Sequence, residues 1–388
     1  MAETVRLAEK DLRNWKLLRD FQERLEATLG GQPLHPSWEH PQRRLEAAEY
    51  LSLFLFGLLN PVLTSMRGLC QASHLERVQA EVCRRPVSLA SFSEAQHLCD
   101  PARLKTIFSS LRQEVGRQPE RRSQPGADPK WLRMMEVVDS TLWYVLPRMH
   151  WALWRNQGVR QNAVRLHVKY HVWESLPSAL AVTTGKACER RQWEQAAQPG
   201  EFHVGDRYFG EDYQLLQRLM DKGCSFAVRL RQSAVWRVEE TLSLTEADRK
   251  AGVVEDLWVR LGSEGQGPRV RLVRVPTQEE DVLIATDVGP RDMSAEVAAL
   301  CYRHRWEVEL FFRWLKYVMG SHHWMAESPT GVAVQLYLTL IAAQRLLLYT
   351  GRRPNKRLLE LLQFYFMGWA SAEEVMALLQ KDTAQKKK

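Results

Sequence analysis

Four side chains late in the sequence combine a carboxylate with two cations and a phenol at fixed spacing: Tyr302, Arg305, Glu309 and Lys316. The stretch that holds them, residues 301–316, contains no Gly or Pro and alternates apolar with charged residues, which predicts a helix. At roughly 100° per residue the four side chains fall within about 60° of one another and share one stripe. The stripe borders the apolar side of the helix, so Glu309 is expected to be partly buried between cations. Such a set is either a salt-bridge ladder, which is the usual case for a charged helix, or part of a site that binds charged groups.

Two more carboxylates are predicted to follow buried strands. Residues 132–141 predict a strand that ends at Asp139, and residues 201–209 predict one that ends at Asp206. A carboxylate at a strand end, followed by hydroxyl residues as at Asp139, is a common layout for a metal ligand. The alternative for each is an Asp that caps a helix or a turn, which is the more frequent role of a lone Asp.

The order and spacing of Tyr302, Arg305, Glu309 and Lys316 resemble the Tyr-Arg-Glu-Lys signature of a family of bacterial insertion-sequence transposases, the IS-four/Tn-five-like family. The resemblance implies an RNase H-like catalytic core with three metal-binding carboxylates, Asp, Asp and Glu. It further implies that Tyr302, Arg305 and Lys316 contact DNA phosphates near the cleaved end. Arg207 is expected to be a further DNA contact.

The same resemblance gives Asp139, Asp206 and Glu309 as the catalytic residues and metal ligands. Cutting a phosphodiester and joining its 3′ oxygen elsewhere is an in-line displacement, in which two metal ions stabilise the entering and leaving oxygens. Hard divalent ions prefer carboxylate oxygens, so two Mg²⁺ ions are expected, with Mn²⁺ able to substitute. We expect Asp139 to bridge the ions, although the residues support the trio without fixing which carboxylate bridges.

The fold class expected is α/β: an RNase H-like core with an inserted, mostly β subdomain, flanked by an N-terminal helical DNA-binding domain and C-terminal helices. A segment rich in Pro, Gly and Arg at residues 116–130 marks the boundary between the first domain and the core. Short runs of alternating apolar and polar residues, separated by glycines, mark the β insertion. A helical bundle without a ligand explains the first domain equally well. The expected parts are an N-terminal DNA-binding domain (1–115), a linker (116–130), the first part of the core (131–233), the β insertion (234–290), the last core helix with the signature (291–325) and a C-terminal helical region that forms dimer contacts (326–388).

The individual elements follow from periodicity and from Gly and Pro positions. In the first domain we expect helices at residues 7–29, 41–59 and 61–82, and a further helix capped by Ser91 or Ser93. In the core we expect a strand at 164–172, with Arg165 and His167 on its polar side. An apolar helix at 330–349 and one last helix are expected to close the fold.

The resemblance implies a DNA-binding protein of the bacterial cytoplasm, associated with the nucleoid, whose partner is double-stranded DNA of the terminal inverted repeats and the target. The net charge of +8 suits a polyanionic partner. Six cysteines without a Cys-x-x-Cys pair indicate reduced thiols and no zinc site. Charged residues follow Met1, and the longest apolar run, Tyr50–Leu59, is too short to span a bilayer, so neither a signal peptide nor membrane association is expected. Transposition joins two ends, so a homodimer on DNA is expected.

Several members of the family stack a Trp of the insertion on a flipped base during a hairpin step. The segment before the last insertion strand, residues 280–284, contains no Trp here. Trp236 and Trp258 are therefore the candidates for base stacking, although packing is the more frequent role of each. Tyr208 also stands where many members have Gly. Use of a hairpin intermediate stays open.

Histidines offer a transition-metal alternative. His167 and His171 share one face of a predicted strand, and His322 and His323 are adjacent. Because no Cys or third ligand accompanies either pair, we expect no such site.

The sequence therefore predicts a DNA transposase that cuts at transposon ends and joins the 3′ ends to target DNA. One alternative is an RNase H-like nuclease without strand transfer, which would use the same site. Another is a non-catalytic DNA-binding relic of a transposase, against which the retained carboxylates argue. A glycosidase with two carboxylates would leave the Tyr-Arg-Glu-Lys stripe unexplained.

Overall fold

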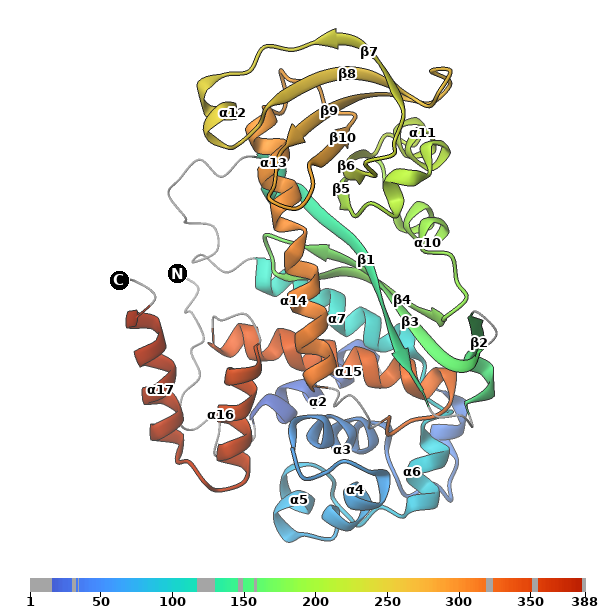
Figure 1. Cartoon of the computed structure of the whole chain (residues 1–388). Coiled ribbons are helices and arrows are strands. Elements are labelled where there is room, and N and C mark those ends of the chain that lie inside the picture. The colour runs from blue at the N-terminus through green and yellow to red at the C-terminus, as the bar shows by residue number, and fades with distance from the viewer. Residues whose placement is uncertain are drawn as a thin grey trace. The chain divides into compact units, whose positions relative to one another are not determined.

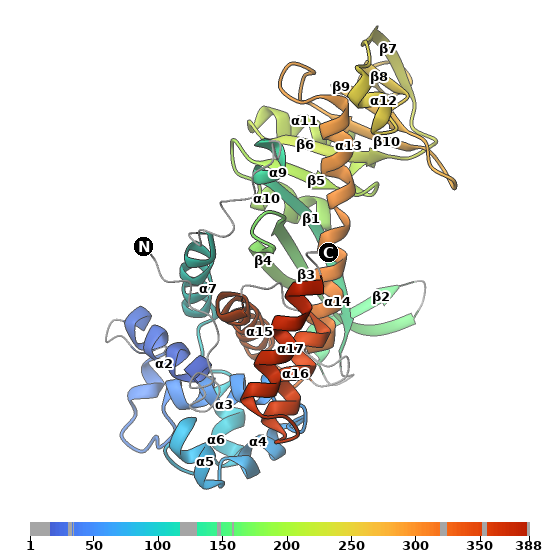
Figure 2. The ribbon, with the colours of Figure 1, turned by 90° about the vertical axis from the view of Figure 1, so that its left-hand side faces the viewer.

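The structure is a computed structural model that describes residues 16–29, 33, 35–116, 130–145, 149–156, 159–318, 324–350 and 355–385. The chain forms two compact units, residues 1–123 with 313–388, and residues 124–312 (Figure 1, Figure 2). Residues 117–129 of the expected linker, His322, His323 and the last three lysines lie outside the described residues.

The second unit is built on a sheet that has ten strands in the described part of the chain (Figure 1). Strand β1 pairs antiparallel with β3, and β3 with β4, whereas β1, β5 and β6 run parallel. The order β4-β3-β1-β5-β6 is that of an RNase H-like core, which confirms the expected fold class. The bounds are β1 (Met135–Tyr144), β2 (Leu153–Asn156), β3 (Val159–His171), β4 (Leu176–Thr184), β5 (Phe202–Gly205) and β6 (Ser225–Leu230). Strand β2 pairs antiparallel with the start of β3.

The strands expected between residues 234 and 287 are present and continue the same sheet. Strand β10 pairs antiparallel with β6, and the order then runs β10-β9-β8-β7. The insertion therefore shares its hydrogen-bonded backbone with the core. Its elements are β7 (Trp236–Thr241), α12 (Glu246–Lys250), β8 (Glu255–Leu261), β9 (Arg269–Val275) and β10 (Val282–Thr286).

Helices cover both faces of the sheet. Val138 and Val228 are buried in one hydrophobic cluster with Trp193 of α10 (Glu189–Ala196) and residues of α11 (Tyr213–Asp221). Because successive side chains of a strand point to opposite faces, Asp139 and Arg229 face the other way. On that other face lie α13 (Ala295–His304) and the first part of α14 (Trp306–Val318), as the contact of Phe311 with Tyr170 at 5.3 Å between ring centres indicates.

A buried ion pair fixes α13 to the insertion. Arg271 of β9 donates two hydrogen bonds of 2.7 Å to the carboxylate of Asp256 on β8 and a third to the carbonyl oxygen of Met293, just before α13. The Arg271 and Asp256 side chains are only 1% and 4% exposed. Asp248 of α12 also accepts a hydrogen bond of 2.7 Å from the backbone N–H of Glu296. The start of the helix that leads to the signature residues is therefore set by the insertion.

Two expected elements of the core differ from the structure. Asp139 is the fifth residue of a ten-residue strand, and residues 132–134 belong to the short helix α9 (Lys130–Met134). The strand was expected to end at Asp139, but antiparallel pairing with β3 continues through Tyr144. The signature helix is interrupted at Arg305, which joins α13 to α14 through a hydrogen bond from its backbone N–H to the carbonyl of Tyr302.

The first unit is helical. Its core contains Tyr50, Phe54 and Phe92, whose rings are 4.8–5.8 Å apart between centres. Helix α15 packs on α7 and α3, and Gln344 of α15 donates a hydrogen bond of 3.0 Å to the carbonyl of Phe108. The elements are α2 (Lys16–Leu29), η1 (Pro36–Glu39), α3 (Ala47–Leu59), α4 (Met66–Ala72), α5 (Glu76–Glu81), α6 (Leu89–Ala95), α7 (Pro101–Gly116), α15 (Pro329–Thr350), α16 (Lys356–Phe366) and α17 (Ala372–Gln385).

Three local expectations in this unit are wrong. The helix expected at 61–82 is divided into α4, which ends at Ala72 with Ser73 as its C-cap, and α5. The residue that caps α6 is Ser88, which accepts from the N–H of Ser91. The chain ends in two helices, α16 and α17, where one was expected, since Gly368 adopts a positive φ of 77° between them.

Among the described residues, one helix segment, Pro329–Leu348 of α15, is long and apolar enough to cross a membrane by length and composition. Its length exceeds that of the apolar run at 50–59 singled out from the sequence. Because 94% of the α15 segment is buried in the structure, it has the character of a core helix.

The ion pair between Arg271 and Asp256 gives a test of this architecture. We expect Asp256→Ala to lower the free energy of unfolding by about 3–5 kcal/mol, because it leaves a buried guanidinium without its counter-charge. Glu246→Ala, which removes the partner of exposed Lys250, is the control and is expected to cost less than about 1 kcal/mol. Urea unfolding followed by tryptophan fluorescence measures both variants, and equal losses would contradict the buried-pair argument.

Candidate active site

Strands β1 and β5 place two carboxylates side by side. The parallel pairing brings Val137 opposite Val204, and Asp139 and Asp206 each lie two residues further on. Asp139 of β1 and Asp206, the residue directly after β5, therefore come close together at the same side of the sheet, since side chains two apart share a face. The negative charge of Asp206 raises the pKa of Asp139, which is the electrostatic sign of this proximity.

The loop after β5 is held in position by three contacts. Asp206 accepts a hydrogen bond of 2.9 Å from the backbone N–H of Tyr208. The carbonyl of Tyr208 in turn accepts from the guanidinium of Arg190 on α10, which also lies 4.1 Å from the centre of the Tyr208 ring. Gly210 allows close approach to β6, because a Cβ there would overlap the carbonyl oxygen of Arg229. These contacts fix the conformation of the loop, and with it the orientation of the Asp206 carboxylate.

Arg305 joins the third carboxylate to the first. Its Nη2 donates a hydrogen bond of 2.7 Å to Oε1 of Glu309, and its Nη1 lies 3.9 Å from Oδ2 of Asp139. The exposed fractions of these side chains are 18% for Arg305, 32% for Glu309 and 19% for Asp139. The guanidinium thus lies between two carboxylates that come from β1 and α14.

The carboxyl group of Asp139 is the most strongly perturbed group of the site. Burial raises its pKa to about 7, and the negative charges of Asp206 and Glu189 act in the same direction. The N–H of Ser140 and the charge of Arg305 oppose that shift. A carboxylate in this setting is poorly compensated at neutral pH and favours a nearby cation.

Tyr302 lies near the carboxylates of the site. Burial raises the pKa of its hydroxyl, the guanidinium groups of Arg305 and Arg229 oppose the shift, and the charge of Asp206 adds to it. Tyr302 is therefore close to Asp206 and to two cations. Lys316 lies seven residues beyond Glu309 on α14, in the unit of residues 313–388, and burial lowers its pKa.

A polar cluster supports β1 from the opposite face. Ser140 donates a hydrogen bond of 2.6 Å to Glu189 at the start of α10, and Arg165 of β3 donates to both Ser140 and Glu189. This cluster lies directly behind Asp139. The sequence placed Arg165 on the polar side of its strand, but it gave no reason to choose Glu189 from a charged helix.

The other residues predicted to contact DNA or to bind metal also belong to the second unit. Arg207 is largely exposed, and its Nη1 lies 3.9 Å from Oε1 of Glu280. Trp236 packs against the hydrophobic cluster, and the guanidinium of Arg269 lies 4.2 Å from the ring centre of Trp258. Both indole rings therefore have packing partners. His167 bonds to the hydroxyl of Thr183 at 2.9 Å.

Carboxylate oxygens are the ligands that hard divalent ions prefer, so the donor set fits such an ion. Asp139 and Asp206 are adjacent, and the raised pKa of Asp139 shows that its charge lacks sufficient compensation. Within the described residues, however, no three His, Cys, Asp or Glu side chains are grouped to hold an ion. The carboxylate of Glu309 is separated from that of Asp139 by the guanidinium of Arg305, which contacts both.

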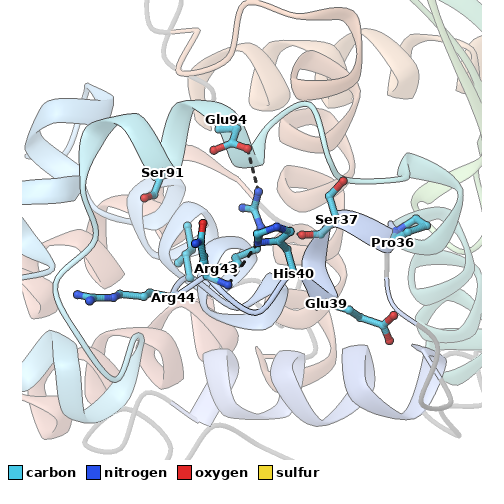
Figure 3. A pocket seen from close by; sticks show the side chains of 10 residues that line it. Pro36, Ser37, Glu39, His40, Arg43, Arg44, Ser91 and Glu94 are labelled. Atoms are coloured by element: carbon cyan, nitrogen blue, oxygen red, sulfur yellow. Dashed lines mark hydrogen bonds and ion pairs between the residues drawn. The ribbon is translucent and has the colours of Figure 1, made fainter.

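The first unit contains a separate cavity of about 750 Å³ between η1, residues 40–45 and α6 (Figure 3). Arg43 donates to Glu94 at 3.0 Å and lies 4.9 Å from the ring centre of Trp38. Arg44 is exposed on the lining. The two guanidinium groups suit contact with an anion better than with a metal ion.

Comparison with known proteins extends these observations. The model of the family described as "Transposase DDE domain" matches residues 136–344. A probable transposase for insertion sequence element IS5377 from Geobacillus stearothermophilus is 29% identical over 224 residues, which are 55% of this chain and 55% of that protein. The putative transposase y4zB of Sinorhizobium fredii is 24% identical over 60% of this chain and 64% of its own length. The chain thus spans between half and two thirds of these two relatives.

A third relative is matched over more of its length. The putative transposase for insertion sequence element IS4SA of Synechocystis is 20% identical over 77% of this chain and 80% of its own. A cryo-EM structure of the piggyBac transposase synaptic complex with hairpin DNA aligns over 97% of this chain and 83% of that one, with 11% identity and a TM-score of 0.43.

The raised pKa of Asp139 predicts how stability depends on pH without metal. The native carboxyl binds its proton more tightly than the unfolded one, so the free energy of unfolding should fall as pH rises from about 4 to 7. Asp139→Asn removes this term and should be more stable than wild type at pH 8, by at most roughly 4 kcal/mol, with no advantage at pH 4.

Thermal unfolding in chelator between pH 4 and pH 8 measures the effect. Asp221→Asn, at an exposed position at the end of α11, is the control and should follow the wild-type curve. Parallel curves for Asp139→Asn and wild type would contradict the assigned environment of Asp139.

Proposed function

The chain belongs to the family of transposase DDE domains, and from this premise we propose that it cuts DNA at transposon ends and joins the 3′ ends to target DNA. The observation that carries the proposal is the site on one face of the sheet. Asp139 of β1 lies close to Asp206, which directly follows the parallel strand β5, and Arg305 connects Glu309 to Asp139. These three carboxylates are the proposed catalytic residues and metal ligands.

The family implies use of a divalent metal, and we propose two Mg²⁺ ions, with Mn²⁺ as a substitute. When bound, they would stabilise the entering and leaving oxygens of an in-line displacement at phosphorus. Asp139 and Asp206 would bind through carboxylates already adjacent to each other. Glu309 would join them if Arg305 released it, which would couple metal binding to movement of Arg305.

The remaining signature residues bind and orient the DNA. Released from the carboxylates, Arg305 can donate paired hydrogen bonds to a phosphate. The buried hydroxyl of Tyr302 stays protonated because its pKa is raised, so it can donate to a phosphate oxygen without adding charge. Lys316 and Arg207 supply further positive charge.

The partner proposed is double-stranded DNA, comprising the terminal repeats and the target. Residues 1–115 would bind DNA, and the cavity with exposed Arg44 is one surface that suits a phosphate. The helices of residues 326–388 would form a homodimer when two ends are brought together. We place the protein in the bacterial cytoplasm with the nucleoid. The packed state of Trp236 and Trp258 gives no support to base stacking by either ring.

The test is incubation with DNA that carries the ends of the parent element, in Mg²⁺, with products resolved on a denaturing gel. Nicks, hairpins and joined strands are distinguishable there, so a nuclease without strand transfer would yield only cut ends. A relic would bind the DNA and leave it uncut.

We expect Glu309→Gln to reduce cleavage by at least about two orders of magnitude, because it removes a charged metal ligand. DNA binding, measured by gel shift, should change little. Glu307→Gln is the matched control, since Glu307 lies on the same helix and accepts from His304 at 2.7 Å. Cleavage by Glu309→Gln at the wild-type rate would contradict the assignment of this carboxylate.

A further inference from the structure

Arg229, which is not one of the signature residues, lies beside the candidate active site. Arg229 is the one charged residue of β6, whose neighbour β5 leads to Asp206. It faces the same side of the sheet as Asp139, because Val228 points into the cluster on the opposite face. Its positive charge acts on the hydroxyl of Tyr302. Arg229 therefore lies among the groups assigned to the DNA phosphate.

The guanidinium of Arg229 is already paired. Its Nη2 donates to Oε1 of Glu280, and the side chain of Arg229 is only 22% exposed. The same oxygen of Glu280 lies 3.9 Å from Nη1 of Arg207, the residue after Asp206. One carboxylate thus attracts two arginines that flank the site.

The turn between β9 and β10 presents Glu280 to these arginines. The hydroxyl of Thr277 donates a hydrogen bond of 2.7 Å to the carbonyl of Glu280, and Thr277 Oγ1 accepts from the N–H of Glu280 at 3.3 Å. Next to it, Asp281 accepts a hydrogen bond of 2.6 Å from Arg274. The position of Glu280 is therefore built into the turn.

A carboxylate and a phosphodiester compete for the same guanidinium, since both offer two oxygens in the geometry of its paired donors. We propose that Arg229 is a further phosphate-binding residue of the active site, and that Glu280 occupies the place of the phosphate until DNA displaces it. The inference rests on the proposed function, because it takes DNA as the ligand of this face.

Charge removal at Glu280 should therefore strengthen DNA binding through Arg229. We expect Glu280→Gln to lower Kd for duplex DNA about three- to tenfold at low salt, because both arginines become available. Glu279→Gln makes the same change of net charge at an exposed position of the same turn and is the matched control. It should have clearly less effect.

The experiment is fluorescence anisotropy of the full chain with a labelled duplex that carries one end of the parent element, in chelator so that no DNA is cut. Wild type, Glu279→Gln, Glu280→Gln, Arg229→Gln and the double variant Arg229→Gln/Glu280→Gln are titrated at several salt concentrations. Arg229→Gln should weaken binding and reduce the salt slope by about 0.9, as expected for one lost phosphate contact. In its background, Glu280→Gln should strengthen binding less than it does in the wild type, because Arg207 alone is then released.

Equal effects of Glu280→Gln and Glu279→Gln would overturn the proposal, because Glu280 would then act through net charge alone. Arg229→Gln with wild-type Kd and salt slope would also overturn it. Thermal unfolding of each variant checks the fold, and Arg229→Lys, which keeps the charge, should retain the response to Glu280→Gln. Wild-type protein that neither cuts nor joins end DNA in Mg²⁺ would contradict the proposed function, and the binding cycle is measured independently of that result.

Discussion

The site depends on one constraint: negatively charged carboxylates lie close together where they are partly buried, so they repel one another. Asp139 and Asp206 lie close together because β1 and β5 are parallel and in register up to Val137 and Val204, two residues before each carboxylate. Arg305 offsets part of their repulsion, and it does so by holding Glu309 as well. One guanidinium therefore both stabilises the metal-free site and keeps its third carboxylate apart. A divalent ion would replace that positive charge and free Arg305 for another anion.

The position of Arg305 depends in turn on parts of the chain far from it in sequence. The helix α13 begins against the carbonyl contact of Arg271 and the carboxylate of Asp248, both in the inserted segment. The short interruption at Arg305 then directs α14 along the face that carries Asp139. The insertion is thus a structural support of the signature helix in addition to any role in binding.

The sequence predicted those features that depend on local pattern. The strands of the core, the insertion strands and the apolar helix α15 follow from alternation and apolar runs, and they are present. Asp206 stands at the end of its strand as expected, whereas β1 continues past Asp139, because antiparallel pairing with β3 extends to Tyr144.

Contacts between distant segments could not be predicted in the same way. Nothing in the composition of residues 186–195 indicates that Glu189 bonds to Ser140. Arg229 is different, because a lone charged residue in an otherwise apolar strand stands out in the sequence and could have been chosen. The sequence could not predict which face of β6 packs against α13. Alternation of side chains defines two faces of a strand, but it does not say which element covers each face.

The way the insertion joins the sheet has a consequence for solubility. Without it, β6 would be an open edge of apolar residues whose backbone groups could pair with another chain. Strand β10 covers that edge and the margin moves out to β7, where charged side chains such as Arg237, Glu239 and Glu240 are spread along an exposed strand. Charges on an edge strand discourage intermolecular pairing. The inserted strands thus also protect the protein against aggregation through this margin of the sheet.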